Sequence, residues 1–328
     1  MAYVRIERIV SAVAALSLVA LIPSTSSAQA RPPLEVIQLR DNFYAIVGAG
    51  ATVAVQAGPD GVILVDTGSG ERSADVVAEI RKITSRPIRY IINTSAHRDH
   101  VGGNDDLSKA GQSVIPTGGL NEIGAAGGRA PILAEEHVQA AMTAPHGEQA
   151  PFPIGAWPTV TYSSDLMETQ KDLYFNGEAI VTTYQPSAYS DGDSVVFFRR
   201  SDVVVAGEVY DPTRFPRIDL EKGGSIQGVI DALNRIIGIT VPPIPLIWQD
   251  GGTVVIGARG RWRPVATAAR IATALCPGGR RGRGRRRCRR GAAALRSQAG
   301  KGQRGDGGDG ASLEGSTKGP HYLPPRLL

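Results

Sequence analysis

The most informative segment of this 328-residue chain reads Ile91-Ile92-Asn93-Thr94-Ser95-Ala96-His97-Arg98-Asp99-His100-Val101-Gly102-Gly103-Asn104. An apolar strand, residues 88–92, runs straight into a polar loop that carries His97, Asp99 and His100. Two imidazoles and one carboxylate within four residues suit zinc, which takes nitrogen and oxygen ligands in tetrahedral sites. We therefore predict a metal site at the end of this strand.

The spacing of the three side chains limits how they can bind. His97 and Asp99 are two positions apart, whereas His100 follows Asp99 directly and points another way. In an extended strand, where neighbouring side chains alternate between faces, the three could not all reach one metal ion. They could serve two adjacent ions from one loop. Gly102 and Gly103 would then allow the backbone to turn tightly into the next helix.

The residues before this loop predict an antiparallel meander followed by a helix. Four segments rich in strand-forming residues are separated by turn signals such as Pro59-Asp60-Gly61. These segments are residues 34–39, 43–47, 52–56 and 62–65. Residues 73–84 have apolar side chains at helical spacing, which predicts an amphipathic helix. The loop thus closes a unit made of a meander, one helix and one further strand.

A similar order of elements follows the loop. We expect strands at residues 113–116, 172–175, 179–184, 194–198, 202–206 and 253–256, and helices at residues 133–142 and 226–237. Asn176-Gly177 is typical of a two-residue hairpin turn. Two such halves predict an α+β fold in which two packed sheets carry helices on their outer faces, a four-layer αββα sandwich.

Four segments, in order, resemble the signatures of the metallo-β-lactamase superfamily. The family pattern His-x-His-x-Asp-His, followed by Gly-Gly, corresponds to residues 95–103. Residues 58–68 match the early strand and its Asp-Thr-Gly turn, residues 185–193 match Pro-x-x-Ala-His-Thr-Asp-Gly-Asp, and residues 206–208 match a strand end that reads Gly-Asp. The resemblance covers residues 43–256 and implies the metallo-β-lactamase sandwich and a metal-dependent hydrolase.

The ligand positions of the family are only partly kept. Ser95 stands where the first histidine is expected, and Tyr189 stands where a later histidine is expected. Glu208 replaces the bridging aspartate with a longer carboxylate that can still bind a metal, and no Gly-His follows the last strand. The resemblance therefore implies a depleted set of metal ligands: His97, Asp99, His100 and Glu208.

Three protein ligands are the usual number for a catalytic zinc that keeps an open position. By resemblance, the first metal site keeps His97 and could share Glu208, whereas Asp99, His100 and Glu208 belong to the second. We therefore expect one zinc ion, Zn(2+), rather than two. Asp99 is the expected catalytic residue, because it would bind the metal and orient the attacking water.

Four further side chains are expected to line the site. Asp66 and Asp193 would orient ligands from behind, or would simply belong to common turn sequences. Ser95 and Tyr189 occupy former ligand positions. The tyrosine could act as a weak phenolate ligand, bond a bound water, or fill the space left by an imidazole. Glu135-Glu136-His137 could form another site, but we interpret it as the exposed start of a helix.

The first thirty residues predict a secretory signal peptide. Arg5 and Arg8 give a positive start, residues 9–22 are apolar, and Ala28-Gln29-Ala30 fits a small-x-small cleavage pattern. The apolar run is shorter than the roughly 20 residues that span a bilayer as a helix, and an uncleaved membrane anchor is the alternative. We expect an exported protein, periplasmic or secreted, that leaves the membrane after cleavage.

The composition changes abruptly near residue 257. From there to the end, 17 Lys and Arg accompany 3 Asp and Glu, a net charge of +14, whereas the preceding part carries −9. Residues 257–328 show no hydrophobic period, which predicts a disordered basic tail. We favour a change of reading frame at this point, because the codons of Gly-Ala-Arg-Gly, read one base later, can spell the missing Gly-His-Gly.

These observations divide the chain into a signal peptide (1–30), a metallo-β-lactamase-like domain (31–256) and a tail (257–328). The expected function is hydrolysis of an ester, thioester, lactone or amide (β-lactam) bond in a small molecule by metal-activated water. An inactive homologue that acts as a binding module is the alternative. Nucleic-acid binding through the tail would require strong salt dependence, and no specific nucleic-acid partner is expected.

Overall fold

The computed structural model describes residues 31–113, 128–145, 151–163, 170–215, 217–241, 252–259 and 263–264. The chain forms two compact units, residues 1–33 and 34–328, and the fold below is that of the second unit. The expected signal peptide and most of the basic tail lie outside the described residues. Within the described ranges, no helix combines the length and the apolar character needed to cross a membrane.

The first sheet contains the N-terminal meander and three later strands. In spatial order its strands are β1 (Glu35–Arg40), β2 (Phe43–Val47), β3 (Val53–Gly58), β4 (Gly61–Val65), β5 (Ile88–Ile92), β6 (Ile132–Glu135) and β7 (Val160–Tyr162). As predicted, β1 to β4 pair antiparallel, whereas β5, β6 and β7 add in parallel. All five residues of β4 are buried, as is usual for a strand covered on both faces.

The second sheet begins with the predicted hairpin. In spatial order its strands are β13 (Arg263–Pro264), β12 (Val254–Ile256), β11 (Val203–Val205), β10 (Ser194–Phe198), β9 (Glu178–Tyr184) and β8 (Gln170–Phe175). The turn between β8 and β9 contains Asn176 and Gly177, whose φ angles of 51° and 76° suit a left-handed two-residue turn. β12 runs parallel to β11, so both strands end at the same edge.

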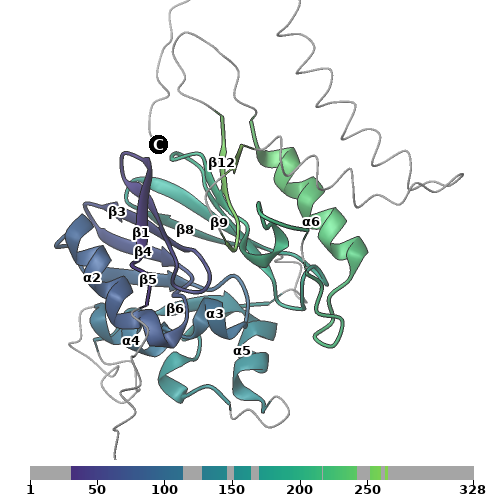
Figure 1. The fold of residues 1–328 in the computed structure, drawn as a ribbon, viewed down its shortest axis with the longest axis horizontal. Coiled ribbons are helices and arrows are strands. Elements are labelled where there is room, and N and C mark those ends of the chain that lie inside the picture. The colour runs from purple at the N-terminus through teal and green to yellow at the C-terminus, as the bar shows by residue number, and fades with distance from the viewer. Residues whose placement is uncertain are drawn as a thin grey trace, which may run out of the picture. The chain divides into compact units, whose positions relative to one another are not determined.

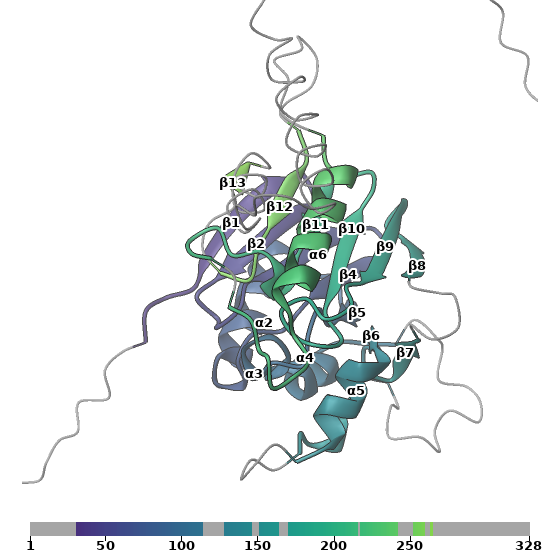
Figure 2. The ribbon, with the colours of Figure 1, turned by 90° about the vertical axis from the view of Figure 1, so that its right-hand side faces the viewer.

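Helices cover the outer faces of both sheets (Figures 1 and 2). α2 (Ser73–Ile83) and α4 (Asn104–Ala110) pack on the first sheet, and α6 (Ile226–Ile239) packs on the second. The inner faces of the sheets share one core, in which the Phe43 and Phe198 rings meet edge to face at 4.8 Å. The predicted four-layer αββα sandwich is confirmed.

The structure divides a segment that the sequence predicts to be one helix, residues 133–142. Its first part belongs to β6, and α5 (Glu136–Thr143) begins only afterwards. The helix prediction is wrong there because β6 pairs with β5 and β7, and a short apolar run does not distinguish a strand from a helix. Glu135 is also fully buried rather than exposed, and its carboxylate caps α5 by accepting a hydrogen bond from the His137 amide.

The remaining helical segments are short. They are α3 (Arg98–Val101) and the 3-10 turns η1 (Gly70–Arg72), η3 (Ile154–Ala156) and η4 (Gly207–Val209). Both α3 and η4 lie next to strand ends, and they carry the candidate ligands described below. Of the strand expected at residues 113–116, only Ser113 is among the described residues, and it is not in a strand.

Candidate metal centre

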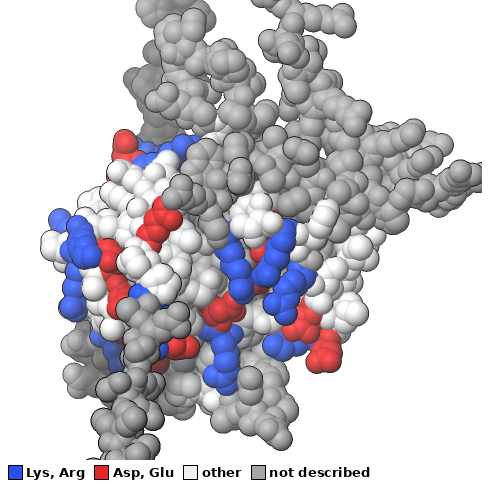
Figure 3. All heavy atoms as spheres, in the orientation of Figure 1, with Lys and Arg blue, Asp and Glu red and all other residues white. Residues whose placement is uncertain are grey.

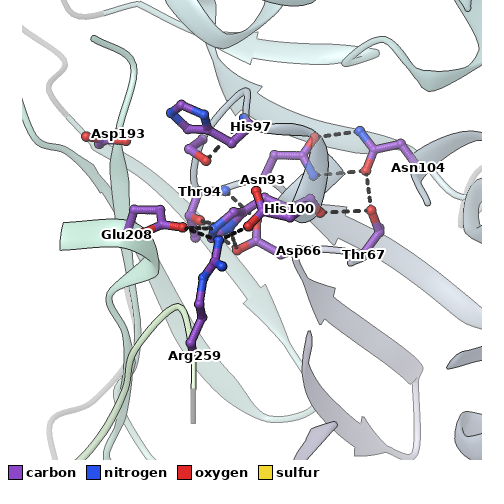
Figure 4. Close-up of polar contacts among 12 residues, drawn as sticks. Asp66, Thr67, Asn93, Thr94, His97, His100, Asn104, Asp193, Glu208 and Arg259 are labelled. Carbon is purple, nitrogen blue, oxygen red and sulfur yellow. Dashed lines mark hydrogen bonds and ion pairs between the residues drawn. The ribbon is translucent and has the colours of Figure 1, made fainter. Parts of the chain in front are cut away.

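The candidate centre lies where strands of both sheets end. β4 leads into Asp66, β5 leads into the loop of residues 93–100, β11 leads into Glu208, and β12 leads into Arg259. β4 and β5 are parallel, as are β11 and β12, so the carboxyl ends of each pair lie at one edge of the sheet. Figure 4 shows Asp66, His100, Glu208 and Arg259 converging there from the two sheets.

His100 is the centre of this arrangement. Its side chain is fully buried, with Nδ1 2.7 Å from Asp66 Oδ2 and Nε2 3.2 Å from Glu208 Oε1. Burial alone would lower the pKa of His100, but the Asp66 and Glu208 carboxylates raise it well above its usual 6.5. A histidine held from behind by a carboxylate has a fixed ring orientation, which is the usual support of a metal-binding histidine.

Asp66 is itself held firmly. Its backbone has a φ of 63°, a left-handed conformation that aspartate tolerates better than most residues. The Thr94 amide donates a hydrogen bond of 2.8 Å to one carboxylate oxygen, and the Thr94 hydroxyl donates one of 2.6 Å to the other. The expected supporting position of Asp66 therefore has a geometric basis, since its carboxylate connects the end of β5 to His100.

A buried polar network holds the rest of the loop. The Thr67 hydroxyl donates to the His100 carbonyl at 3.0 Å, and it also lies 3.0 Å from the Asn104 side-chain oxygen. Asn93 and Asn104 exchange two side-chain hydrogen bonds, of 3.1 and 2.8 Å. These bonds satisfy polar groups that are shut away from water and fix the loop on the first sheet.

The structure requires glycine at positions 102 and 103 for a reason other than the tight turn that the sequence suggests. Their φ angles of −59° and −86° are open to any residue, so no special turn is required. A side chain would instead collide with neighbouring backbone. A Cβ atom on Gly102 would lie 2.4 Å from Arg98 O and 2.6 Å from Gly70 N, and one on Gly103 would lie 2.7 Å from Thr67 O. The glycines let the site loop approach residues 67–70.

Three of the expected ligands come together. Asp99, His100 and Glu208 each offer one ligand atom, and these atoms lie within 4.8 Å of one another. The Glu208 side chain is only 4% exposed and that of Asp99 is 29% exposed. Burial would raise the pKa of Glu208, but hydrogen bonds and charge from His100 and Arg259 lower it to about 2. Glu208 is therefore ionised at neutral pH, as a metal ligand must be.

His97 lies beside this group rather than within it. Its ring packs edge to face on Tyr189, with ring centres 4.7 Å apart. Burial, together with the positive charges of Lys222 and His100, lowers its pKa to about 4, so the imidazole is neutral at pH 7. Ser95 is fully buried, and its hydroxyl accepts a hydrogen bond from the His97 amide at 3.4 Å.

Tyr189 occupies the space beside His97. The residue is 7% exposed, and burial and the nearby Glu208 carboxylate raise its pKa above the usual 10.0. A raised pKa disfavours the phenolate form, which weakens the interpretation of Tyr189 as a metal ligand. Its packing on the imidazole agrees better with the space-filling alternative.

Asp193 shapes the neighbouring turn. Its carboxylate accepts hydrogen bonds from the Ser190 amide at 2.7 Å and from the Ser190 hydroxyl at 3.1 Å. Burial raises the pKa of Asp193 to about 7. The Ser194 amide in turn donates to the Thr94 carbonyl at 2.8 Å, which joins this turn to the loop of His100. The structure thus places Asp193 behind the turn that carries Tyr189.

Arg259 is the site residue that the sequence analysis misses. One guanidinium nitrogen contacts Asp99 Oδ2 and lies 3.1 Å from Glu208 Oε1. The register of β11 and β12 would have indicated this contact. Val205 pairs with Ile256. Glu208 lies three residues after Val205, and Arg259 lies three residues after Ile256. Equal distances from paired positions in parallel strands place two side chains next to each other.

The fold extends beyond the boundary expected at Ile256. Ala258 is fully buried, its amide donates to the Tyr210 carbonyl at 3.0 Å, and its carbonyl accepts from the Thr52 amide at 2.8 Å. Beyond it, β13 pairs with β12. Residues 257–259 therefore belong to the sandwich rather than to the basic tail.

Glu135, Glu136 and His137 form a second group of potential ligands. His137 Nδ1 lies 2.8 Å from Glu135 Oε1, and its ring stacks on Tyr184 at 5.9 Å. The hydroxyl of Tyr184 donates to Asp191 at 2.6 Å. Because Glu135 already caps α5 and bonds His137, these contacts are explained by local structure.

Comparison with known proteins agrees with this geometry. A model of the metallo-beta-lactamase superfamily matches residues 45–246, which is more than half of the chain. The protein therefore belongs to the metallo-beta-lactamase superfamily.

Two solved structures share the fold at low sequence identity. A metallo-beta-lactamase from Pontibacter korlensis is 14% identical, covers 74% of this chain and 98% of its own, and superposes with a TM-score of 0.53. The DIM-1 metallo-beta-lactamase is also 14% identical, with coverage of 74% and 97% and a TM-score of 0.53. At this identity the likeness concerns the fold.

A curated relative is similar over a short segment. The linear primary-alkylsulfatase of Pseudomonas sp. (strain ATCC 19151) is 50% identical over 46 residues, which is 14% of this chain. The match spans 9% of the length of that enzyme.

The donor set fits a single zinc ion. One imidazole nitrogen and two carboxylate oxygens are the ligand types that catalytic zinc sites use, with one position left for water or substrate. His100 Nε2 points toward Glu208, and Nδ1 is held by Asp66, so the nitrogen that would bind the metal is the one facing the other ligands. His97 is not among the three residues whose ligand atoms converge.

Proposed function

We propose that the protein is a hydrolase that uses one zinc ion bound by Asp99, His100 and Glu208. The observation that carries this proposal is the position of His100, which is buried, fixed from behind by Asp66 at 2.7 Å and directed at Glu208. Three buried ionisable groups meet here, Asp66, His100 and Glu208, and a divalent ion bound by His100 and Glu208 would balance the charge of the carboxylates. When bound, zinc supplies Lewis-acid polarisation of the scissile bond and a water that loses its proton near neutral pH.

The residues of the chain would then orient the reactants. Asp99 is the more exposed of the two carboxylate ligands, and its second oxygen can accept a hydrogen bond from the attacking water. His97, neutral at pH 7, can accept a hydrogen bond or a proton beside it. Tyr189 keeps its phenolic proton and can donate a hydrogen bond to the substrate. This division gives His100 and Glu208 binding roles and leaves the proton transfers to more accessible groups.

The substrate would enter over Tyr189. A cavity of about 360 Å³ is lined by Tyr189, Arg217, Ile218, Asp219, Leu220 and Glu221. It is large enough for part of a small molecule and contains both apolar and charged groups. An ester, a thioester, a lactone or an amide, including a β-lactam, would each present a carbonyl to the metal from this cavity.

A sulfate ester is a second candidate substrate. The 46-residue match to a linear primary-alkylsulfatase favours it. Lys222 raises the positive potential at His97, and Arg217 does so at Tyr189. In Figure 3, lysine and arginine side chains gather, mixed with acidic ones, between the positions of α3 and α6 in Figure 1. An anionic substrate with an alkyl chain would suit this surface better than a neutral ester would.

Zinc binding tests the proposal directly. We expect the chain to saturate at one zinc ion, measured by elemental analysis after equilibrium dialysis against a weak chelator. Asp99→Ala and His100→Ala should abolish this binding, because two protein ligands are too few for a stable site. His97→Ala should weaken binding much less.

His137→Ala is the matched control, since it removes an imidazole from the other group of potential ligands. It should leave the stoichiometry at one. Zinc retained in folded His100→Ala protein, or no saturable binding in the unmodified chain, would rule out the proposed centre. A panel of carboxylic esters, lactones, β-lactams and alkyl sulfates then decides between the two substrate classes.

A further inference from the structure

The end of β12 brings a positive charge into the candidate centre. Arg259 contacts Asp99 and lies 3.1 Å from Glu208, two of the three residues that would bind zinc. Its Nε is buried and has no hydrogen-bond partner within the described part of the chain. The guanidinium thus leaves one polar group unsatisfied while it bonds the carboxylates through another.

We propose that Arg259 is a built-in cation that occupies the zinc position and competes with the metal for Asp99 and Glu208. This inference rests on the proposed function, because it concerns the same ligands. Arg259 contacts Asp99 through Oδ2 and Glu208 through Oε1, and Glu208 Oε1 is also the oxygen that faces His100 Nε2. A zinc ion must approach them to about 2 Å, which leaves no room for a nitrogen already in hydrogen-bond contact with both.

The charges explain why a cation is held there. Asp66, Asp99 and Glu208 contribute three carboxylates around one histidine, and like charges so close repel one another. Arginine suits this role because its charge is permanent and it offers several donors to carboxylates. The guanidinium therefore offsets part of this repulsion in the apo protein.

The backbone delivers Arg259 to this position. Gly257 packs so tightly that a Cβ atom there would lie 2.3 Å from Tyr210 O, and the hydrogen bonds of Ala258 to Tyr210 and Thr52 fix the next residue. The Arg259 side chain is 36% exposed, so it has a route to solvent when an ion replaces it. Displacement requires a change of side-chain conformation and no movement of the sheets.

The competition predicts that removing the guanidinium strengthens zinc binding. Arg259→Ala should lower the dissociation constant for zinc about tenfold or more, the scale of one charge-assisted contact. Arg259→Gln should act in the same direction and serves as a second variant if the alanine protein folds poorly. The measurement is zinc titration of the full chain against a chromophoric chelator.

Arg129→Ala is the matched control, because Arg129 forms a similar ion pair with Asp105, 2.8 Å away, on the outer side of the first sheet. It should leave the zinc affinity unchanged. A second readout is thermal unfolding without metal. Arg259→Ala should unfold at a lower temperature than the unmodified chain, and saturating zinc should restore it.

The outcomes separate this inference from the proposed function. If the unmodified chain and both Arg259 variants bind one zinc with equal affinity, the metal centre stands and the competition is refuted. If neither the unmodified chain nor the folded variants bind zinc, the proposed function fails and the competition fails with it. If the Arg259 variants bind zinc more tightly than the unmodified chain and Arg129→Ala does not, both the metal centre and the competition are supported.

Discussion

Asp66 fixes the position of His100, a candidate metal ligand, without being one of the expected ligands itself. Its carboxylate bonds the Thr94 amide, the Thr94 hydroxyl and His100 Nδ1 at once. The ring of His100 can rotate only by giving up the last of these contacts. The orientation of the candidate ligand is therefore set by a neighbouring carboxylate rather than by the histidine itself.

Asp66→Asn should weaken zinc binding about 10- to 100-fold, the effect usual for a lost partner of a metal-binding histidine. Asparagine tolerates the positive φ of this position, so the backbone should be kept. The His100 pKa, followed by NMR in the apo protein, should fall toward its usual value because the Asp66 charge, the largest of the effects that raise it, is gone.

Asp75→Asn is a suitable control for this experiment, because Asp75 pairs with Arg72 and its side chain is 54% exposed. It should change neither the zinc affinity nor the His100 pKa. Unaltered zinc affinity in Asp66→Asn would contradict the supporting role of Asp66.

Residues of the candidate site could be proposed from the sequence where a pattern marks them, although His97 lies beside the converging ligands rather than among them. His97, Asp99 and His100 stand together after an apolar strand, and a cluster of these ligand types is typical of a metal site. Arg259 carries no such mark, because it stands where the composition turns basic and resembles the arginines that follow. Only the register of β11 and β12 shows that its side chain lies beside Glu208.

At the scale of elements, the loop between β5 and α4 depends on close backbone contact. Gly102→Ala would force a methyl group to within 2.4 Å of Arg98 O and 2.6 Å of Gly70 N. We expect this change to cost about 1–3 kcal/mol, the usual cost of overpacking. It should also weaken zinc binding, because α3 carries Asp99 and His100.

Gly238→Ala provides the contrast. Gly238 lies in α6, and nothing stands within 4 Å of the place where its Cβ would be. Alanine is the better helix former by about 1 kcal/mol, so this variant should be as stable as the unmodified chain or slightly more stable. Denaturant unfolding measures the stability of both variants. If Gly102→Ala were as stable as Gly238→Ala, the close-contact explanation would be contradicted.

Elements with a strong local pattern were predicted well, and elements set by pairing were not. The meander, α2, the β8–β9 hairpin and α6 follow their sequence signals closely. β6 does not, because its four residues become a strand only by lying between β5 and β7. The sequence of this segment does not show which strands lie beside it. It is therefore equally compatible with a longer helix.

At the scale of the whole molecule, a buried polar cluster joins the two sheets. Gln56 on β3 donates a hydrogen bond to Glu178 on β9, and Asn176 donates to Gln56 at 3.0 Å. Glu178 also accepts hydrogen bonds of 3.0 Å from the Arg200 amide and 2.6 Å from the Ser201 hydroxyl. Glu178 is 2% exposed and Gln56 is fully buried, so the Gln56 amide would lose its hydrogen bond without gaining one to water.

Glu178→Ala should therefore lower the free energy of unfolding by about 1–3 kcal/mol, since it leaves the buried Gln56 donor unsatisfied. Glu79→Ala, which removes a helix-surface partner of Lys82, should cost less than about 0.5 kcal/mol. Urea unfolding of the two variants measures the difference. Similar small effects would mean that the sheets are joined by apolar packing alone.

The layer order of the molecule was predictable, but its C-terminal limit was not. Repetition of strands and helices along the chain predicts two sheets with helices outside, and the structure has this arrangement. The sequence predicts that the domain ends at Ile256, because the amino-acid composition changes after this residue. Burial of Ala258 and the pairing of β13 depend on long-range contacts, which composition does not reveal.

The division of the site between two sheets also has a kinetic consequence. His100 and Glu208 stand 108 positions apart, on different sheets, so the pocket is complete only after the sheets have docked. An ion that binds only there recognises the native state and adds stability by mass action. Such long-range contacts form late in folding. The bound ion should therefore leave the folding rate almost unchanged and lower the rate of unfolding, in which the two sheets separate.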